Sequence, residues 1–355
     1  MGRYTVHTVN GPKQKTVYGR TRAEAAEKLT KAMADRDCGL IFQAGTVTLG
    51  QYMERWLEDS VRDTVRQRTY ERYEQVFRVH IRPALGQVKL MVLTSAHIRG
   101  LIRQKLDAGL SGSSVRQVHV TLNKALKQAV DDCLVPRNVA ASVKAPRPRR
   151  EEVRPLEREQ VRALFEAARG ERLEALYTLA VTAGLRRGEL LGLKWEDLDL
   201  EAGTLEVRRS LSDARSGRAF IPPKSGKGRQ IRLARSATTA LKSHRKRQLE
   251  EKMRLGGLWK DHGLVFHSQV GTPLWARNLI RSYKRLLEQA GLSTNFRFQD
   301  LRHTCATLLL RQGVNPKFVQ ELLGHGDVSL TLNVYSHVLP SMGDQTAVAM
   351  DDALG

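Results

Sequence analysis

The amino-acid sequence predicts a multidomain chain that is mainly α-helical and carries small antiparallel β-sheets. Residues 46–145 repeat apolar positions at the spacing of helical turns, which indicates a group of amphipathic helices. Short extended runs with glycine-containing turns occur near the N-terminus and again after residue 200, which favours small sheets before and after those helices in the chain. The 355 residues are enough for two or three domains with separate hydrophobic cores.

Residues 1–44 are expected to form a β-hairpin followed by one helix. Residues 4–9 are an alternating run, Asn10-Gly11 is a dipeptide typical of tight hairpin turns, and residues 15–18 provide the return strand. A helix is expected from Thr21 to about Ala34, because apolar residues recur on one face there. The segment is therefore predicted to be a small domain of its own.

Residues 46–145 are expected to form a helical domain. Four apolar stripes at 3.6-residue spacing predict four helices that pack on one core. The predicted core residues are Leu49, Tyr52, Met53, Trp56 and Leu57; Tyr70, Tyr73, Phe77 and Ile81; Ile98, Leu101, Ile102 and Leu106; and Val115, Val118, Leu122, Ala125, Leu126 and Ala129. The opposite faces are rich in arginine and lysine, which suits contact with phosphate groups.

The remaining chain is divided into a linker and a mixed α+β domain. Residues 146–155 contain three prolines and no apolar period, so they are expected to be an extended, charged linker. In the domain 156–355, helices are expected near 157–168 and 172–183. Three short strands, at 204–209, 219–221 and 230–233, predict one small antiparallel sheet.

The charge balance predicts a polyanionic partner. The chain has 59 lysines and arginines against 37 aspartates and glutamates, a formal net charge of +22. Neutralising phosphates releases counterions and supplies most non-specific nucleic-acid affinity. The excess is larger before residue 150, which makes the N-terminal part the more basic. Charge alone does not separate nucleic acid from other anionic surfaces.

The cysteines and the apolar stretches of the sequence limit where the protein is expected in the cell and which metals it is expected to bind. Cys38, Cys133 and Cys305 are odd in number and lack metal-ligand spacing, so neither a disulfide framework nor a zinc site is expected. The chain does not open with a charged-then-apolar leader, and its apolar stretch at 175–185 is too short for a membrane span. We expect a cytoplasmic protein of a bacterial cell, associated with the nucleoid, with no metal, no cofactor and no membrane partner.

The stretch 298–337 places three chemically active side chains on short, separately capped elements. Asn315-Pro316 predicts a helix start, and Gly324 ends that helix one residue before His325. Ser329 is expected to cap a second short helix, 330–334, that delivers Tyr335 at its end. Each of these residues taken alone could have a purely structural role. For example, a tyrosine at the end of an apolar helix is an ordinary core residue.

An upstream segment changes that reading. Residues 182–191 read TAGLRRGELL, where Gly184 breaks a helix and sets Arg186 at the start of the next. A helix N-terminus already favours an anion, so an arginine there is well placed to hold a phosphate. Together with Arg302, His325 and Tyr335, this gives four ordered positions that are hard to match by chance.

The motifs TAGLRRGELLGLKW, DLRHTCATLLL and LLGH, followed by Tyr335, resemble the signature boxes of the tyrosine recombinase, or phage integrase, family. The resemblance spans the chain. It implies that Arg186, in a box with Glu189, and Arg302 are the catalytic arginines. It also implies that His325 is the box histidine and that Tyr335 is the nucleophile.

Two further site positions follow from the resemblance. The family holds a catalytic lysine on a β-hairpin, and in the turn 222–229 Lys224 matches this position best, with Lys227 as an alternative. The family pattern has a histidine three residues before the second arginine, whereas this chain has Gln299. An amide can donate a hydrogen bond to a phosphate but cannot accept and return a proton near neutral pH. We expect Gln299 to position the phosphate without transferring a proton.

The resemblance implies a site-specific recombinase that cuts and rejoins DNA through a 3′-phosphotyrosyl intermediate and a Holliday junction, without metal or ATP. Residues 1–44 would be an abbreviated arm-type DNA-binding domain, 46–145 the core-binding domain, and 156–355 the catalytic domain with a C-terminal oligomerisation tail. The implied partners are double-stranded DNA attachment sites and a homotetramer on DNA, with a host DNA-bending factor and a directionality factor as accessory proteins.

The N-terminal hairpin favours an integrase of a phage or integrative element, because resolvases and invertases of the family usually lack it. A resolvase of the Xer type, or an invertase, is the alternative enzyme. A DNA-binding regulator that does not cleave is the alternative from another class, and Gln299 is the feature that favours it. Type IB topoisomerases use similar chemistry, but the boxes resemble those of recombinases.

Overall fold

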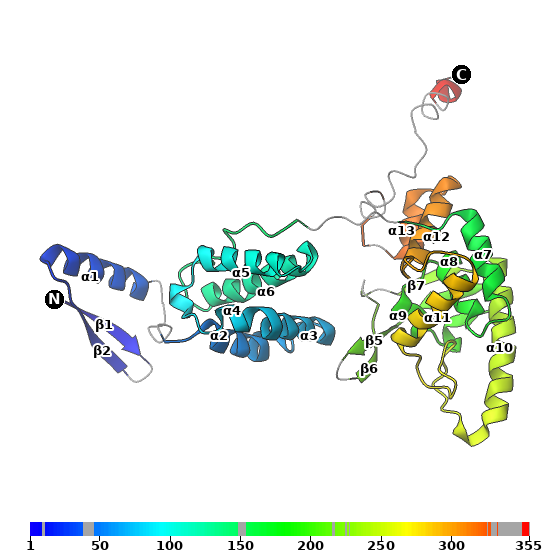
Figure 1. Cartoon of the computed structure of the whole chain (residues 1–355), viewed down its shortest axis with the longest axis horizontal. Coiled ribbons are helices and arrows are strands. Elements are labelled where there is room, and N and C mark those ends of the chain that lie inside the picture. The colour runs from blue at the N-terminus through cyan, green and yellow to red at the C-terminus, as the bar shows by residue number, and fades with distance from the viewer. Residues whose placement is uncertain are drawn as a thin grey trace. The chain divides into compact units, whose positions relative to one another are not determined.

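The computed structural model describes residues 1–8, 11–37, 46–147, 154–214, 217–223, 226, 228–324, 326–327, 332 and 350–354. The chain divides into two compact units, Met1–Arg150 and Glu151–Gly355. Figure 1 colours the first unit blue to cyan and most of the second green to orange. Within both units most described residues that have regular structure are helical, as the sequence predicts.

The first unit begins with the predicted hairpin and helix. Strands β1 (Gly2–Thr8) and β2 (Gly11–Val17) are antiparallel, with Gly2 opposite Val17 and Thr8 opposite Gly11. Helix α1 (Arg22–Asp37) extends three residues beyond the predicted end. The strands are longer than predicted toward the N-terminus, because a ladder of backbone hydrogen bonds does not require alternating side chains. Asn10, at the predicted turn, lies outside the described residues.

The helical part of this unit follows the predicted stripes. Its helices are α2 (Leu49–Arg55), α3 (Gln67–Val76), α4 (Arg82–Leu85), α5 (Ser95–Asp107) and α6 (Gly112–Asp131), with π-helical turns at 56–61 and 77–81. Of the predicted core residues, Tyr70 and Ile102 are partly buried and the others, except Leu106, are fully buried. Leu106 is 42% exposed, because it lies on the last turn of α5, beyond the part that packs against the core.

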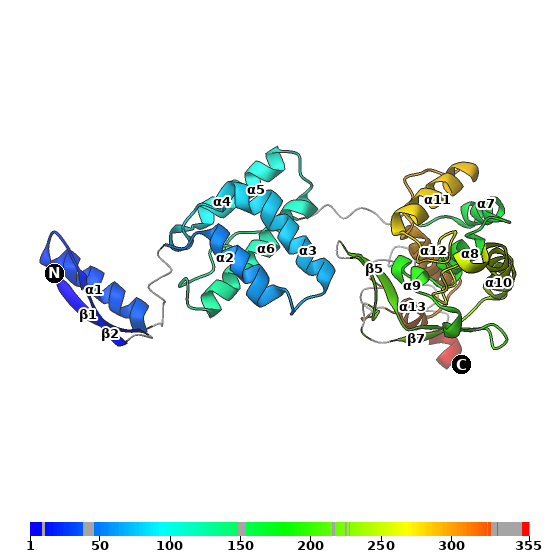
Figure 2. The same ribbon diagram turned by 90° about the horizontal axis from the view of Figure 1, so that it is seen from below.

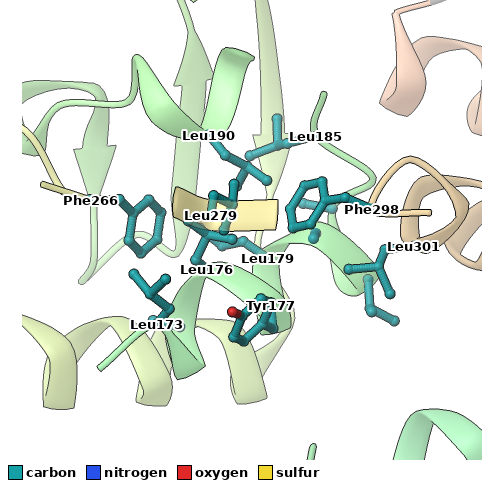
Figure 3. Packing of buried hydrophobic residues seen from close by; sticks show 14 of the residues in the cluster. Leu173, Leu176, Tyr177, Leu179, Leu185, Leu190, Phe266, Leu279, Phe298 and Leu301 are labelled. Carbon is teal, nitrogen blue, oxygen red and sulfur yellow. The ribbon is translucent and has the colours of Figure 1, made fainter. Parts of the chain in front are cut away.

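The second unit packs around one buried helix. Its helices are α7 (Arg158–Ala168), α8 (Glu174–Thr182), α9 (Arg187–Leu191), α10 (Arg235–Leu255), α11 (Ala276–Gln289), α12 (Asp300–Arg311) and α13 (Pro316–Leu323). All residues of α8 from Ala175 to Val181 are buried. Figure 3 shows how α8 contributes Leu176, Tyr177 and Leu179 to a cluster with Leu279 and Phe298. This core fixes the segments that carry the candidate site.

The sheets of the second unit differ from the prediction. Strands β3 (Leu198–Asp199), β4 (Thr204–Val207) and β7 (Arg229–Arg232) form one antiparallel sheet in the order β3-β4-β7, whereas β5 (Ser210–Ala214) pairs with β6 (Gly217–Ile221) in a separate hairpin. The prediction of one sheet from three strands was therefore wrong. Ser-Leu-Ser-Asp-Ala in β5 has few residues that favour strands, so its pairing with β6 has no clear sequence signal.

Two long helices also had no predicted counterpart. The buried positions of α10 are Ala237, Leu241, His244 and Gln248, which keep helical spacing but include two polar residues. Helix α11 begins after Trp275 without a side-chain cap. Among the described helices, none combines the length and the apolar character that crossing a membrane requires.

Candidate active site

Arg186 sits at the N-terminal end of α9, directly after the break that ends α8. Gly184 has a φ of +58°, and a Cβ built there would lie 2.5 Å from Leu323 Cδ2. Only glycine fits this combination of left-handed backbone and close packing. The break frees the chain from α8 and turns the Arg186 side chain toward the end of α13. That side chain is 25% exposed.

The Arg186 side chain and backbone both bind one carboxylate. Arg186 Nη1 donates to Glu189 Oε1 at 2.8 Å, and the Arg186 backbone N–H donates to Glu189 Oε2 at 2.9 Å. Glu189 therefore caps the first turn of α9, where backbone N–H groups otherwise have no partner. Its side chain is 2% exposed, so both bonds form away from bulk water.

Arg302 is a buried cation on the first turn of α12. It is 3% exposed, and its Nη1 and Nη2 donate to the carbonyl oxygens of Gly184 and Leu323, both at 2.6 Å. A buried charge requires such hydrogen bonds, and the planar guanidinium can reach two acceptors at once where lysine cannot. Arg302 thereby ties the break before α9 to the end of α13.

The C-terminal end of α13 is the point where these arginines meet. Arg302 binds the carbonyl of Leu323, Arg186 Nη2 donates to the carbonyl of Gly324 at 3.0 Å, and Arg229 Nε donates to the carbonyl of Leu322 at 2.8 Å. The last carbonyls of a helix lack partners within the helix and carry its negative dipole end. Three successive carbonyls thus accept hydrogen bonds from three guanidinium groups. Figure 2 shows α9, α13 and β7 close together.

Arg229 also completes the environment of Glu189. Its Nη1 lies 3.2 Å from Glu189 Oε1 and its Nη2 lies 2.8 Å from Oε2. Burial raises the pKa of Glu189, but the hydrogen bond and charge of Arg229, followed by those of Arg186, outweigh burial. The pKa of this carboxyl group therefore lies below its usual value, and the group stays ionised at neutral pH.

Gln299 precedes α12 and is exposed. Its carbonyl oxygen accepts the backbone N–H of Arg302 at 3.1 Å, which places it one turn from the buried arginine. The adjacent Asp300 is buried and accepts hydrogen bonds from Arg297, including its backbone N–H at 2.7 Å. Farther along α12, Thr304 Oγ1 accepts the backbone N–H of Leu156 at 2.9 Å. The start of α12 is thus held from several sides.

The structure brings Arg186 and Arg302 together at α13 and places Gln299 nearby. Lys224, Lys227, His325 and Tyr335 lie outside the described residues, as does the predicted helix 330–334 except for Leu332. The predicted start of α13 is confirmed, because Asn315 Oδ1 accepts the Lys317 N–H at 2.8 Å. Gly324 ends the helix in the left-handed conformation, with a φ of +64°. Sequence reasoning did not identify Arg229, since nothing in a glycine-containing turn followed by arginine indicates a partner forty residues upstream.

Two family models match the chain. Residues 154–342 match the model described as Phage integrase family, and residues 48–106 match Phage integrase, N-terminal SAM-like domain. The first match alone spans more than half of the sequence, and the chain belongs to the phage integrase family.

Individual relatives agree with this assignment. A protein of Caldanaerobacter subterraneus subsp. tengcongensis described as tyrosine recombinase XerC-like is 33% identical, over 96% of this chain and 92% of its own. The Tn1549 transposon integrase in complex with transposon right end DNA has a TM-score of 0.73 at 21% identity, covering 87% of this chain and 100% of that one. A lambda integrase tetramer bound to a Holliday junction has a TM-score of 0.60 at 23% identity, with 96% and 93% covered. These two structures establish the likeness of fold.

Family membership and the likeness to the recombinase from Caldanaerobacter define the class of enzyme. The chain is a tyrosine site-specific recombinase, which cuts and rejoins DNA strands through a phosphotyrosyl intermediate.

Proposed function

We propose that this recombinase is the integrase of a phage or integrative element and that it acts on double-stranded DNA attachment sites through a Holliday junction. The observation that carries the proposal is the convergence of Arg186 and Arg302 on the carbonyls of Leu323 and Gly324, one residue before His325 in the chain. Two guanidinium groups at one point suit a phosphate group with two non-bridging oxygens.

The N-terminal part supports an integrase rather than a resolvase. Strands β1 and β2 with helix α1 precede the helical part of the first unit, and such a hairpin-and-helix segment is what an arm-type DNA-binding domain would provide. We assign arm binding to 1–44, core binding to 46–145, a linker to 146–155, and catalysis to 156–355. If the protein were a resolvase or an invertase, residues 1–44 would have no assigned function.

The proposed chemistry assigns one role to each residue. Tyr335 loses its phenolic proton to solvent, attacks the phosphorus and forms a 3′-phosphotyrosyl bond, while the bond to the 5′-oxygen breaks and Lys224, or Lys227, gives that oxygen a proton. Arg186 and Arg302 neutralise the non-bridging oxygens. His325 donates a hydrogen bond to the scissile phosphate, and Gln299 positions the phosphate without moving a proton. The covalent bond conserves the energy of the phosphodiester, so religation needs no ATP.

The side-chain geometry of Arg186 suits this role. A guanidinium has five N–H donors, and Arg186 directs one at Glu189 and one at Gly324. Within the described part of the chain, its remaining donors and its 25% exposure leave room for a phosphate. Fixing the side chain before DNA arrives lowers the cost of ordering it in the reaction.

The assembly we propose is a homotetramer on two attachment sites, consistent with the tetramer described for lambda integrase on a Holliday junction. The C-terminal tail would dock on a neighbouring subunit. A host DNA-bending factor and a directionality factor are proposed accessory partners, and the protein would act on the nucleoid in the bacterial cytoplasm. Its net charge of +22 favours this DNA association.

The test is covalent capture of the protein on nicked attachment-site DNA, followed by denaturing electrophoresis. The wild type should form a protein–DNA adduct, Tyr335→Phe should form none, and Tyr283→Phe, at a tyrosine whose buried hydroxyl has no hydrogen-bond partner among the described residues, should match the wild type. An adduct that persists in Tyr335→Phe would refute the nucleophile assignment. If the wild type binds a genuine site and forms no adduct, the regulator that Gln299 favours becomes the better reading.

A further inference from the structure

The buried carboxylate of Glu189 pairs with two arginines, Arg186 and Arg229, which differ in their exposure to solvent. Arg186 is 25% exposed, whereas the side chain of Arg229 is 10% exposed and that of Glu189 is 2% exposed. Arg229 is the first residue of β7, where it pairs with Val207 of β4. Its guanidinium is held by Leu322 O and both oxygens of Glu189. Arg229 therefore faces the protein, while Arg186 reaches the surface.

The charges at this point determine what Arg186 can offer to a phosphate. Arg186 and Glu189 alone would form a neutral pair, because the carboxylate lies 2.8 Å from the guanidinium. With Arg229 at 2.8 Å from the other carboxylate oxygen, the group of three carries a net positive charge. Arg302 adds a second positive charge through the same end of α13. Because Glu189 and Arg229 are buried, such charges are poorly screened.

We propose that Arg229 is a positioning residue, which neutralises Glu189 so that Arg186 keeps its positive charge for the scissile phosphate. The proposal rests on the phosphate-binding role given to Arg186 above. Glu189 is needed to orient Arg186 and cap α9, and Arg229 offsets the negative charge that this orientation brings. The hydrogen bond from Arg229 to the Leu322 carbonyl holds the guanidinium next to the Glu189 carboxylate. Arg229 itself does not touch the DNA.

The first measurement is the rate of adduct formation in a single turnover on nicked attachment-site DNA, with protein in excess. Arg229→Gln should lower this rate about 10-fold or more, as expected when one preorganised electrostatic group is lost. The dissociation constant for the same DNA, from gel shifts, should change less than about 3-fold, because Arg229 is not a DNA contact. Arg232→Gln removes the same charge from an exposed position on β7 and should retain the wild-type rate.

The second measurement separates a charge effect from a structural one. In Arg229→Gln, the further change Glu189→Gln removes the uncompensated carboxylate, so the double variant should be about 3-fold or more faster than Arg229→Gln alone. Arg229→Lys keeps the charge and should likewise be faster than Arg229→Gln. A purely structural role predicts the opposite, since a second substitution in the same cluster would slow the reaction further.

Several outcomes overturn the proposal. The proposal is wrong if Arg229→Gln reacts at the same rate as Arg232→Gln. It is also wrong if the double variant Arg229→Gln/Glu189→Gln reacts no faster than Arg229→Gln alone. If Arg229→Gln does not fold, as judged by its melting temperature, a folded Arg229→Lys variant that reacts about 10-fold more slowly than wild type is the contradicting result. Failure of the proposed function is seen separately, because the wild type would then form no adduct or Tyr335→Phe would still form one.

Discussion

Gln299 is the site position that departs from the family pattern expected from the sequence. Its amide can donate a hydrogen bond to a phosphate but cannot accept and return a proton near neutral pH. It is exposed, and its backbone carbonyl accepts the Arg302 N–H at 3.1 Å. A different side chain of similar size therefore disturbs no described packing at this position.

We predict that Gln299→His leaves the rate of adduct formation the same or higher, because imidazole adds proton transfer to the hydrogen bond that the amide already provides. Single-turnover adduct formation between about pH 6 and pH 8 measures this, with the melting temperature as a control for folding. A severe loss of rate in a stable Gln299→His protein would contradict the view that Gln299 serves for positioning only.

Arg186 was predicted from a local pattern, the helix break at Gly184. Arg302 was predicted from the resemblance of its motif, DLRHTCATLLL, to a family box. Arg229 and its bond to Glu189 join β7 to α9 across forty residues. Such a contact depends on how the elements pack, and no local pattern indicates it. Strand β5 was not predicted for a different reason, because few of its residues favour strands.

At the scale of elements, the end of α13 does more than terminate a helix. It presents the carbonyls of Leu322, Leu323 and Gly324 to Arg229, Arg302 and Arg186, respectively. Gly324 makes this possible, because its left-handed backbone turns the chain away from the helix axis. A Cβ at Gly324 would also lie 3.0 Å from Arg229 Nη1.

Gly324→Ala is therefore expected to slow adduct formation as well as to lower stability. The left-handed backbone costs about 1–2 kcal/mol for a residue with a Cβ, and the added methyl group displaces the Arg229 guanidinium. Gly313→Ala is the matched control, because Gly313 follows α12 with a φ of +75° and a Cβ added there would have nothing within 4 Å. Both variants should lose similar stability in urea unfolding, but only Gly324→Ala should react more slowly. Equal rates for the two would show that the Arg229 position does not depend on Gly324.

Two helix starts illustrate what local sequence can predict. Asn315 caps α13 by accepting the Lys317 N–H, as predicted, and Thr94 caps α5 by accepting the His97 N–H. Helix α10 lacked such a signal, because two of its four buried positions are the polar residues His244 and Gln248. Burial lowers the pKa of His244 to about 4, so it packs as a neutral ring.

At the scale of the whole molecule, the hairpin and helix of residues 1–44 separate the integrase reading from the resolvase reading. This segment has eight lysines and arginines against four aspartates and glutamates. A variant that begins at residue 45 keeps the helices α2 to α6 and the whole second unit.

We predict that this shortened variant still forms the covalent adduct on a nicked core site but recombines complete attachment sites at least about 10-fold less efficiently. Losing several phosphate contacts weakens binding steeply with salt, so the deficit should grow between about 50 mM and 200 mM salt. Recombination of plasmid-borne sites measures the effect, and the adduct assay controls for an intact catalytic unit. A shortened protein that recombines complete sites as well as the wild type would favour a resolvase.

The three arginines at α13 also constrain how this helix can vary in length. Successive residues of an α-helix are rotated by about 100°, so each of the three carbonyls has its own position around the helix axis, next to its own arginine. Substitution at an exposed position such as Phe318, which is 65% exposed, leaves those directions unchanged. Inserting or deleting one residue between Asn315 and Gly324 would redirect all three carbonyls at once. The segment thus tolerates replacement at exposed positions but is fixed in length, and recombinases built on this plan should differ in α13 by replacement rather than by gaps.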